Sequence, residues 1–315
     1  MVSVLQNSPS HGQSSLESLS VKGCFDVRHR DAYLRWRDNK QNAIAKAPEL
    51  TLIEISNPYR LSRSEKTAIK ACCQRHNSCL YELLTPPRDD PRDAVVALGQ
   101  ALGLKRLDQS LGGARHPVAT ISVSQKTPFR DYIPYTNQPI NWHTDGYYNE
   151  AARQIHGVIM HCAQPAETGG TNSLLDPELV YIKVRDTDPD MIEALMASDA
   201  LCIPANVRNG KEVRPARCGP VFSLNPRSGN LHMRYTARTT SAQWRTAEKF
   251  DISTQLGTAI LDLAKDRALA VRLTRNQGII CNNVLHTRDG FDAPAQPARA
   301  RTVLRARFYD RVFGT

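Results

Sequence analysis

The stretch INWHTDGYYNE, residues 140–150, places a histidine and an aspartate two positions apart, after a tryptophan and before a glycine. The pair His143 and Asp145 follows a proline-rich loop, at a point where we expect a strand. Residues i and i+2 of a strand project from the same face, so this imidazole and this carboxylate could bind one metal ion together. Spacing alone does not decide the point, because His29 and Asp31 repeat it within a charged run typical of a surface helix.

A third ligand for such a site lies far along the chain, in GIICNNVLHTRDGF (278–291), where His286 ends an apolar run. Two histidines and one carboxylate on one face of an octahedron leave the other positions open, which is the arrangement of non-haem Fe(II) oxygenases. Zinc in a hydrolase could use the same ligands, so the triad does not name the metal by itself.

The residues that discriminate between these metals follow in ARARTVLRARFYD (298–310). In the strand expected here, Arg301, Val303 and Arg305 share one face. An arginine that faces the inside of a barrel is costly unless an anion meets it, and a dicarboxylate cosubstrate would do so by bidentate pairing. The alternative is that these arginines cover a surface face of the last strand.

The composition bounds the class of protein. With 315 residues, 41% of them apolar and 23% charged, the chain is typical of a soluble globular protein. The N-terminal sequence lacks the basic start and apolar centre of a signal peptide, and no apolar stretch approaches the roughly 18 residues of a membrane-spanning helix. We therefore expect a cytoplasmic location without membrane contact, and eight reduced, mostly buried cysteines, since no C-x-x-C occurs.

The formal charge of +10 favours anionic partners. The basic residues are spread along the chain, without the stripe interleaved with aromatic residues that would indicate nucleic-acid binding. We therefore expect a small-molecule substrate, and Arg217, Arg234 and Arg238, which flank the middle strands, permit an anionic one. Structural salt bridges would explain these arginines equally well, and the sequence leaves the oligomeric state open.

Local patterns divide the chain into three parts. Residues 1–20 are polar and predict a disordered or loosely packed tail. Residues 21–115 are mainly helical in pattern, and we expect them to pack on the core within one structural domain. Residues 116–315 carry short β-type runs separated by Gly, Pro, Asn and Asp turns, with two helices across them. This order favours a jelly-roll core over an alternating βαβ sheet.

Several stretches, taken together and in order, resemble a known family. The family is that of the Fe(II)- and 2-oxoglutarate-dependent dioxygenases of the taurine dioxygenase and clavaminate synthase type, and the resemblance covers roughly residues 115–312. The stretches that carry it are NWHTDG (141–146), AETGGTNSLLD (166–176), NLHMRYTART (230–239), NNVLH (282–286) and RTVLR (301–305).

The resemblance implies an α+β fold with a double-stranded β-helix, or jelly roll, at its core and with flanking and inserted helices. It makes His143, Asp145 and His286 the ligands of Fe(II). With O2, 2-oxoglutarate would be converted to succinate and CO2 while an unactivated C–H bond of the substrate is hydroxylated or desaturated. Because related halogenases replace the carboxylate with a small residue, Asp145 argues against halogenation.

The resemblance also implies how 2-oxoglutarate is held. Arg301 should pair with its distal carboxylate. Family members commonly place a threonine shortly after a double glycine to bond the same carboxylate; here the count from the glycines leads to Asn172, with Thr171 as the rival. Arg305 is expected at the metal-facing end of the site, near the substrate or the iron-bound end of the cosubstrate.

The loop 126–141, which contains Tyr132 and Tyr135, directly precedes the metal motif and is a candidate active-site lid; an ordinary long connection is the alternative. His156 and His161 are interpreted as core histidines or as neighbours of the site, since the triad is complete without them. Two other functions stay open at this point. The same iron chemistry could act on a protein or nucleic-acid side group, or the chain could be a non-catalytic metal-binding jelly roll.

Overall fold

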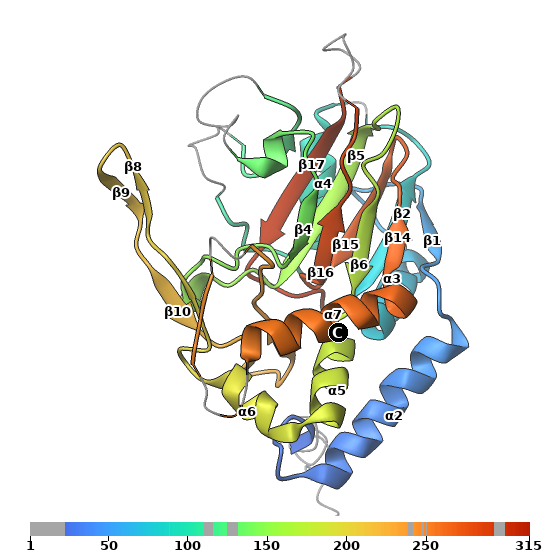
Figure 1. Cartoon of the computed structure of the whole chain (residues 1–315). Coiled ribbons are helices and arrows are strands. Elements are labelled where there is room, and N and C mark those ends of the chain that lie inside the picture. Colours follow the sequence, from blue (N-terminus) through green and yellow to red (C-terminus); the bar gives the residue numbers. More distant parts are fainter. Residues whose placement is uncertain are drawn as a thin grey trace, which may run out of the picture.

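Ten strands of the described part of the chain form two facing sheets, and helices gather below them in the view of Figure 1. The structure is a computed structural model. It describes residues 23–87, 89–109, 116–124, 132–238, 242–246, 249, 251–292 and 300–315.

The larger sheet has six strands. In spatial order they are β1 (Leu52–Ile55), β2 (Ser78–Leu83), β15 (Gln277–Cys281), β5 (Gly157–Gln164), β17 (Thr302–Phe308) and β3 (Ala119–Ile121). β1 and β2 are parallel, and the other neighbours are antiparallel. Strand alternation gives the sheet two apolar faces: along β17, Val303 enters one buried cluster, whereas Leu304 and Ala306 enter another on the opposite face.

The smaller sheet has four antiparallel strands. In spatial order they are β14 (Leu269–Val271), β6 (Asn172–Leu175), β16 (Leu285–Arg288) and β4 (Ile140–His143). Leu174 of β6 belongs to the same buried cluster as Met160, Ile279 and Val303 of the larger sheet, so these side chains fill the space between the two sheets. Two sheets that face each other across this core confirm the predicted jelly roll.

Two helices cover the outer face of the larger sheet, α3 (Arg63–His76) and α4 (Pro91–Ala101). α3 begins at a capping box, in which the Glu65 N–H donates to the Ser62 hydroxyl at 3.1 Å and the Ser62 N–H donates to the Glu65 carboxylate at 2.6 Å. It ends at Asn77, whose left-handed conformation stops the helix and turns the chain into β2.

A second group of helices surrounds another apolar core in the lower part of Figure 1, and this core includes Leu175 and Leu285 from the smaller sheet. The helices are α2 (Arg30–Lys46), α5 (Pro177–Thr187), α6 (Pro189–Met196) and α7 (Ile252–Arg267). Asp176 and Asp188 cap α5 and α6, each followed by a proline at the first helical position.

Short strands lie between α6 and α7. β10 (Arg217–Gly219), β7 (Leu201–Ile203) and β13 (Gln243–Trp244) form a small sheet, and β11 (Phe222–Leu224) pairs with β12 (Leu231–Met233). β8 (Asn206–Arg208) and β9 (Lys211–Arg214) form a hairpin that projects from the body at the left of Figure 1. Two short 3-10 helices, η2 (Ile133–Tyr135) and η3 (Ala151–Arg153), lie before and after β4 in the chain.

One pair of cysteines departs from the expectation that all eight are reduced. Cys202 of β7 and Cys218 of β10 lie directly opposite each other in an antiparallel pair and form a disulfide, with their Cα atoms 3.9 Å apart. That expectation was wrong for these two residues, because the register that brings them together depends on pairing that the sequence spacing does not show. The six other cysteines are reduced and buried, as expected.

The N-terminal region does more than pack on the core, because β1 and β2 pair in the same sheet as β15, β5 and β17. The division at residues 115 and 116 therefore stays a prediction, and the predicted tail, residues 1–20, lies outside the described residues. Within the described part of the chain, no helix combines the length and the apolar character needed to span a membrane. The cellular location stays a prediction.

Candidate active site

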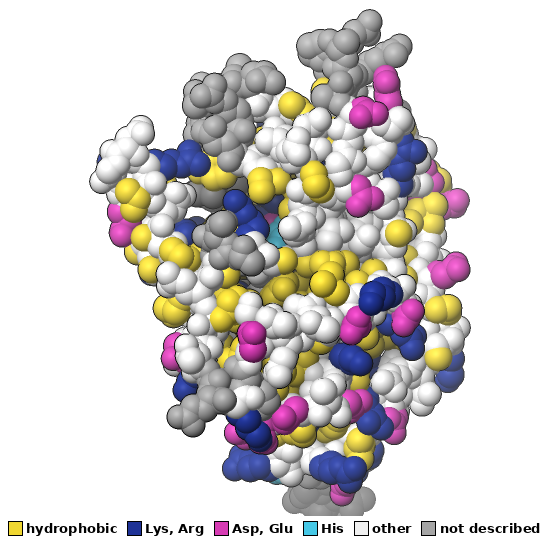
Figure 2. All heavy atoms as spheres, in the orientation of Figure 1, with side chains coloured by type: hydrophobic (Ala, Val, Ile, Leu, Met, Phe, Trp, Pro, Cys, Tyr) yellow, Lys and Arg dark blue, Asp and Glu magenta, His cyan; other side chains and the backbone are white. Residues whose placement is uncertain are grey.

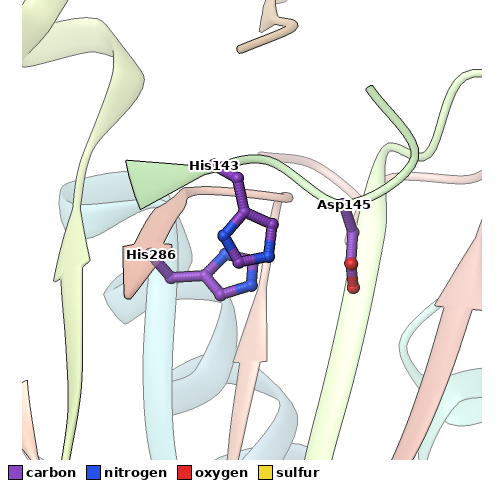
Figure 3. A group of neighbouring side chains, drawn as sticks. All are labelled: His143, Asp145 and His286. Carbon is purple, nitrogen blue, oxygen red and sulfur yellow. The ribbon is translucent and has the colours of Figure 1, made fainter. Parts of the chain in front are cut away.

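Two strands of the smaller sheet bring the predicted histidines together. β4 ends at His143, and its antiparallel pairing with β16 sets His143 directly opposite His286. The two ring centroids are 4.2 Å apart. Asp145 follows just after β4, and the three residues each offer a ligand atom within 4.8 Å of the others (Figure 3). The three predicted ligands thus form one cluster that could hold a metal ion.

Hydrogen bonds fix which nitrogen each histidine presents. The Nδ1 atoms of His143 and His286 lie 2.8 Å from the carbonyl oxygen of Asn141 and 3.0 Å from that of Val284. A carbonyl oxygen only accepts, so Nδ1 carries the proton and Nε2 keeps its lone pair for a metal. Burial lowers the pKa of both histidines, and with the neighbouring His286 it lowers the pKa of His143 to about 3, which keeps both rings neutral.

Asn283 joins the two segments that carry the ligands. Its side-chain oxygen accepts from the Asp145 N–H at 2.8 Å, and its amide nitrogen donates to the carbonyl oxygens of Asp145 at 2.9 Å and Ile155 at 2.7 Å. Asn283 is buried and has a φ of 51°, a left-handed conformation that asparagine tolerates better than most residues. The sequence stretch NNVLH contains this residue, but pattern alone gave it no role.

The Asp145 carboxylate is held on one side only. Its Oδ1 accepts from the Arg305 guanidinium at 3.0 Å, whereas its buried Oδ2 has no hydrogen-bond partner in the described part of the protein. Burial alone would raise the pKa of Asp145, but Arg305, Arg307 and the two histidines outweigh it and lower the pKa to about 2. A buried, ionised oxygen without a partner is costly, and a metal cation next to two neutral imidazoles would remove that cost.

Arg301 lies just before β17 and is buried, with only 8% of its surface exposed. Burial lowers its pKa, and no hydrogen bond or ion pair joins its side chain to any described residue. Its guanidinium lies 5.3 Å from the centre of the Phe291 ring, and a Cβ at Gly170 would come within 3.2 Å of its Nε. A buried guanidinium with free donors is suited to a small carboxylate, and Gly170 leaves space beside it.

The two rival residues for the cosubstrate lie at the start of β6. Asn172 is buried and, two positions before Leu174, shares the strand face that lines the space between the sheets. Thr171 precedes the strand and is half-buried, and its carbonyl accepts from the Asp289 N–H at 2.8 Å. The geometry therefore brings Asn172 to the inner side of the sheet.

Comparison with known proteins identifies the family. The sequence matches the family model described as Taurine catabolism dioxygenase TauD, TfdA family, over residues 42–307. The chain belongs to this family. Fe(II) and 2-oxoglutarate are therefore its cofactor and cosubstrate, and it is an oxidoreductase, as predicted. The zinc hydrolase and the non-catalytic jelly roll are set aside.

Individual members of the TauD, TfdA family differ widely from this chain. It is 29% identical over 170 residues to a uridine-5'-phosphate dioxygenase of Amycolatopsis sp., a match that covers 52% of this chain and 59% of that relative. Its fold is similar to that of the non-haem iron oxygenase OrfP in complex with Fe and α-ketoglutaric acid, with a TM-score of 0.56, 14% identity, and coverage of 93% and 91% of the two chains. It is also similar to asparagine oxygenase in complex with Fe(II), 2S,3S-3-hydroxyasparagine and succinate, with a TM-score of 0.55, 17% identity, and coverage of 78% of each chain.

In this dioxygenase the predicted lid loop is anchored where it is described. The Arg288 guanidinium donates to the carbonyl oxygens of Pro134 at 3.2 Å, Thr136 at 2.8 Å and Gln138 at 2.5 Å. Residues 126–131 of the loop lie outside the described residues. Arg288 is two residues beyond His286 on β16, so the described part of the loop is tied directly to a strand that carries a candidate metal ligand.

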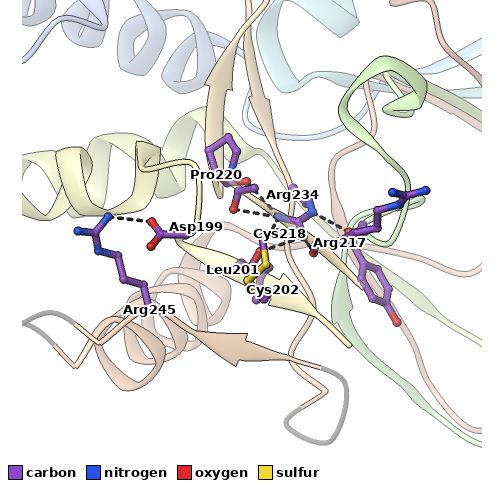
Figure 4. The surroundings of a disulfide bond; sticks show 10 residues. Asp199, Leu201, Cys202, Arg217, Cys218, Pro220, Arg234 and Arg245 are labelled. Carbon is purple, nitrogen blue, oxygen red and sulfur yellow. Dashed lines mark hydrogen bonds and ion pairs between the residues drawn. A yellow bond between two sulfur atoms is a disulfide. The ribbon is translucent and has the colours of Figure 1, made fainter. Parts of the chain in front are cut away.

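For Arg217, Arg234 and Arg238 the sequence left two roles open, binding of an anionic substrate and structural pairing, and the three residues differ in their contacts. Buried Arg234 donates to five backbone carbonyls, so its role is structural (Figure 4). They are those of Tyr147 at 2.7 Å, Leu201 at 2.9 Å, Gly219 at 3.0 Å, Arg217 at 2.9 Å and Pro220 at 3.5 Å. Arg217 lies 3.6 Å from a carboxylate oxygen of Glu150, a weak ion pair. Arg238 is exposed, at the edge of a pocket of about 220 Å³ that Trp142 and Trp244 also line.

His156 and His161, interpreted as core residues or as neighbours of the site, are half-buried and buried, respectively. His161 is buried, and its Nδ1 lies 3.1 Å from the Tyr81 hydroxyl. His156 packs against His232, with 4.6 Å between the ring centroids. Neither contributes a ligand atom to the metal cluster.

Sequence reasoning missed two further features of the site. One is Arg307, which pairs with buried Asp108 at 2.5 Å and donates to the Tyr148 hydroxyl at 2.8 Å. The other is the β8–β9 hairpin. The stretch VRNGKEVR (207–214) could have revealed it, because Asn-Gly between alternating residues is a strong indicator of a tight hairpin.

Proposed function

We propose that this dioxygenase hydroxylates or desaturates an unactivated C–H bond of a small anionic metabolite, and that its substrate class is the nucleoside 5'-monophosphates. In this proposal His143, Asp145 and His286 hold Fe(II), and Arg301 holds the distal carboxylate of 2-oxoglutarate. One observation carries the metal and cosubstrate roles: the chain has a cluster of three groups that could hold a metal ion, with an orphaned carboxylate oxygen, and a buried arginine without an acidic partner among the described residues.

Each ligand is oriented before a metal arrives. The carbonyls of Asn141 and Val284 hold the Nδ1 hydrogens, so both histidines present Nε2. Arg305 occupies Oδ1 of Asp145 and leaves Oδ2 for the metal. This contact supports the prediction that Arg305 lies at the metal-facing end of the site, where it would keep the carboxylate ionised and fix its angle.

For the cosubstrate, Arg301 offers a planar pair of N–H donors that matches a carboxylate. Gly170 gives the carboxylate room to approach. We favour Asn172 over Thr171 as the second donor, because Asn172 shares the inward face of Leu174. Its amide can donate one hydrogen bond to the carboxylate, in place of the hydroxyl that a threonine would offer.

When both are bound, Fe(II) and 2-oxoglutarate supply the oxidising chemistry: O2 and 2-oxoglutarate yield succinate and CO2, and for hydroxylation the second oxygen atom enters the substrate C–H bond. The chain itself supplies position and shielding. The neutral histidines and the Asp145 carboxylate carry one negative charge in total, which suits a divalent cation. The two sheets keep bulk water away from the reacting atoms.

A nucleoside monophosphate fits the charge of the protein and of the site. The relative in Amycolatopsis sp. is a uridine-5'-phosphate dioxygenase, and this chain spans little more than half of its length. The net charge of +10 attracts anions. Figure 2 shows a hollow in which a histidine side chain is visible, with Lys and Arg side chains beside it, so an anionic group would meet positive charge at the entrance.

The first experiment tests the site without a substrate. Under anaerobic conditions, Fe(II) and then 2-oxoglutarate are added to the apo-protein, and the weak visible charge-transfer band of the iron chelate is recorded. We expect the band in the wild type, its loss in His286→Ala, and a shift to much higher 2-oxoglutarate concentration in Arg301→Ala. Folded, iron-loaded wild type without a band would overturn the assignment of these residues.

The second experiment tests the substrate class. With O2 present, succinate formation is measured with uridine 5'-phosphate, uridine and asparagine as candidate substrates. We expect stimulation by uridine 5'-phosphate above the slow uncoupled reaction, with uridine weaker because it lacks the phosphate. If only asparagine stimulates succinate formation, the proposed nucleotide substrate class is wrong, but the proposed iron site still stands.

A further inference from the structure

The β8–β9 hairpin carries a basic face. Its turn, Asn209 and Gly210, has φ values of 49° and 75°, the backbone of a tight two-residue hairpin turn. Across the strands, Arg208 lies directly opposite Lys211, so both side chains leave the same face. The other face carries Val207, which is 58% exposed.

A β-bulge extends this basic face toward the base of the hairpin. The register shifts between Asn206 and Val207, so that Arg214 lies opposite Asn206. Asn206 and Arg208 are two residues apart on one strand and therefore share a face. The bulge thus adds Arg214 to the face that carries Arg208 and Lys211.

The two ends of this face each contact a tyrosine, one before and one after the metal motif in the sequence. The Arg208 guanidinium lies over the Tyr132 ring, 4.4 Å from its centre, and Tyr132 begins the loop segment that Arg288 anchors. The Arg214 guanidinium lies 5.8 Å from the centre of the Tyr148 ring, whose hydroxyl accepts from Arg307.

These contacts connect the hairpin to the metal ligands on both sides. Arg288 is two residues from His286 on β16, and Arg307 is two residues from Arg305, the partner of Asp145, on β17. In Figure 2 the projecting hairpin borders the hollow that holds the visible histidine, with Lys and Arg side chains on its inner edge. The hairpin therefore forms one edge of the entrance to the site.

The two arginines differ in what remains free. Arg214 donates to the carbonyl oxygens of Pro204 at 2.7 Å and Pro215 at 2.9 Å, so its donors are used to hold the hairpin base. Arg208 is half-buried, and no hydrogen bond or ion pair joins it to any described residue. The contact with the Tyr132 ring holds the Arg208 guanidinium in place and leaves its N–H donors available for bidentate pairing with a phosphate.

The base of the hairpin is held firmly, which makes the position of Arg208 well defined. Cys202 and Cys218 close the segment that contains the hairpin by a disulfide. Arg234 donates to the carbonyl oxygens of Leu201, Arg217 and Gly219, which flank those cysteines (Figure 4). Because its base is fixed by these bonds, the hairpin would lose little conformational entropy when it binds a ligand.

We propose that Arg208, held at the edge of the entrance by the β8–β9 hairpin, binds the anionic group of the substrate. The proposal rests on the proposed function and refines it, because it identifies the residue that would distinguish a phosphorylated substrate from its uncharged counterpart. The ligand group is a phosphate monoester, paired through two N–H groups of the guanidinium.

The test compares Arg208→Gln and Arg208→Lys with Arg63→Gln, which removes the same charge from the exposed first turn of α3, on the outer face of the larger sheet. Steady-state succinate formation is measured with uridine 5'-phosphate and with uridine. For Arg208→Gln we expect the KM for uridine 5'-phosphate to rise roughly 10- to 100-fold, because the variant loses hydrogen bonds to a charged group. Arg208→Lys should recover part of the loss, and the KM for uridine should not change.

The anaerobic iron and 2-oxoglutarate band is recorded for every variant, and it should equal that of the wild type, because Arg208 touches neither ligand. An unchanged KM for uridine 5'-phosphate in Arg208→Gln overturns the proposal, as does an equal rise for uridine. If the wild type forms the band but does not turn over uridine 5'-phosphate, the substrate class fails separately. Arg208 is then tested by calorimetric titration of the anaerobic complex with inorganic phosphate. Weaker phosphate binding by Arg208→Gln than by the wild type supports the role of Arg208. Equal affinity in the two proteins, or no phosphate binding by the wild type, overturns it.

Discussion

At the scale of single residues, Asn283 supports the candidate metal site without belonging to its three proposed ligands, because its amide fixes the backbone of Asp145. Asn283→Gly keeps the left-handed backbone accessible but removes these hydrogen bonds, whereas Asn283→Ala also adds backbone strain of about 1–2 kcal/mol. We expect Fe(II) affinity to fall at least about tenfold in both variants, and thermal stability to fall further in Asn283→Ala. Anaerobic Fe(II) titration and thermal unfolding measure the two effects. Wild-type affinity in Asn283→Gly would show that Asp145 needs no such support.

Asn283 also marks how far residue-level prediction extends. The pairing of His143 with Asp145 follows from the two-residue period of a strand, and His286 is recognisable at the end of an apolar run, so the three could be proposed from local pattern. The role of Asn283 depends on a contact with backbone 138 positions away. No local pattern contains such a contact, because it exists only after the two strands pair.

At the scale of elements, the described part of the predicted lid is the segment on which the hairpin rests, through Tyr132. Tyr132→Leu removes the aromatic face beneath Arg208, whereas Tyr132→Phe keeps it. We expect Tyr132→Leu to raise the KM for uridine 5'-phosphate about 2- to 30-fold, because this factor corresponds to the free energy of a cation–π contact. The KM of Tyr132→Phe should remain close to that of the wild type. Fe(II) affinity should stay unchanged in both. Equal losses of iron binding and of turnover in Tyr132→Leu would contradict a role in substrate recognition.

Elements were predictable where one local pattern determines them. The capping pattern of Ser62 and Glu65 predicts the start of α3, and Asn209 with Gly210 could have predicted the hairpin. The bulge that turns Arg214 to the face of Arg208 could not be predicted, since it is a property of two paired strands. The disulfide between Cys202 and Cys218 was missed for the same reason.

At the scale of the whole molecule, the order of β-type runs was enough to predict a jelly roll, but not what joins its layers. Four parts of the chain meet at a buried polar cluster. The Lys40 ammonium of α2 lies 2.6 Å from carboxylate oxygens of both Asp176 and Glu178, at the start of α5. Asn77, which ends α3, donates to Asp176 at 2.8 Å, and Arg311 near the C-terminus lies 3.8 Å from Glu178. These residues are distant in sequence, so their charges gave no indication of a shared site.

This polar cluster leads to a prediction about global stability. Burial alone would lower the pKa of Lys40, but Asp176 and Glu178 outweigh it, so the lysine stays charged and balances the carboxylates. Lys40→Met keeps the length of the side chain but leaves that buried negative charge without its nearest cation, and should lower the free energy of unfolding by about 3–5 kcal/mol. Lys46→Met, on the exposed last turn of the same helix, should change it by less than about 0.5 kcal/mol. Urea unfolding at neutral pH measures both, and a midpoint for Lys40→Met equal to that of Lys46→Met would mean that the cluster contributes nothing to holding the helices on the jelly roll.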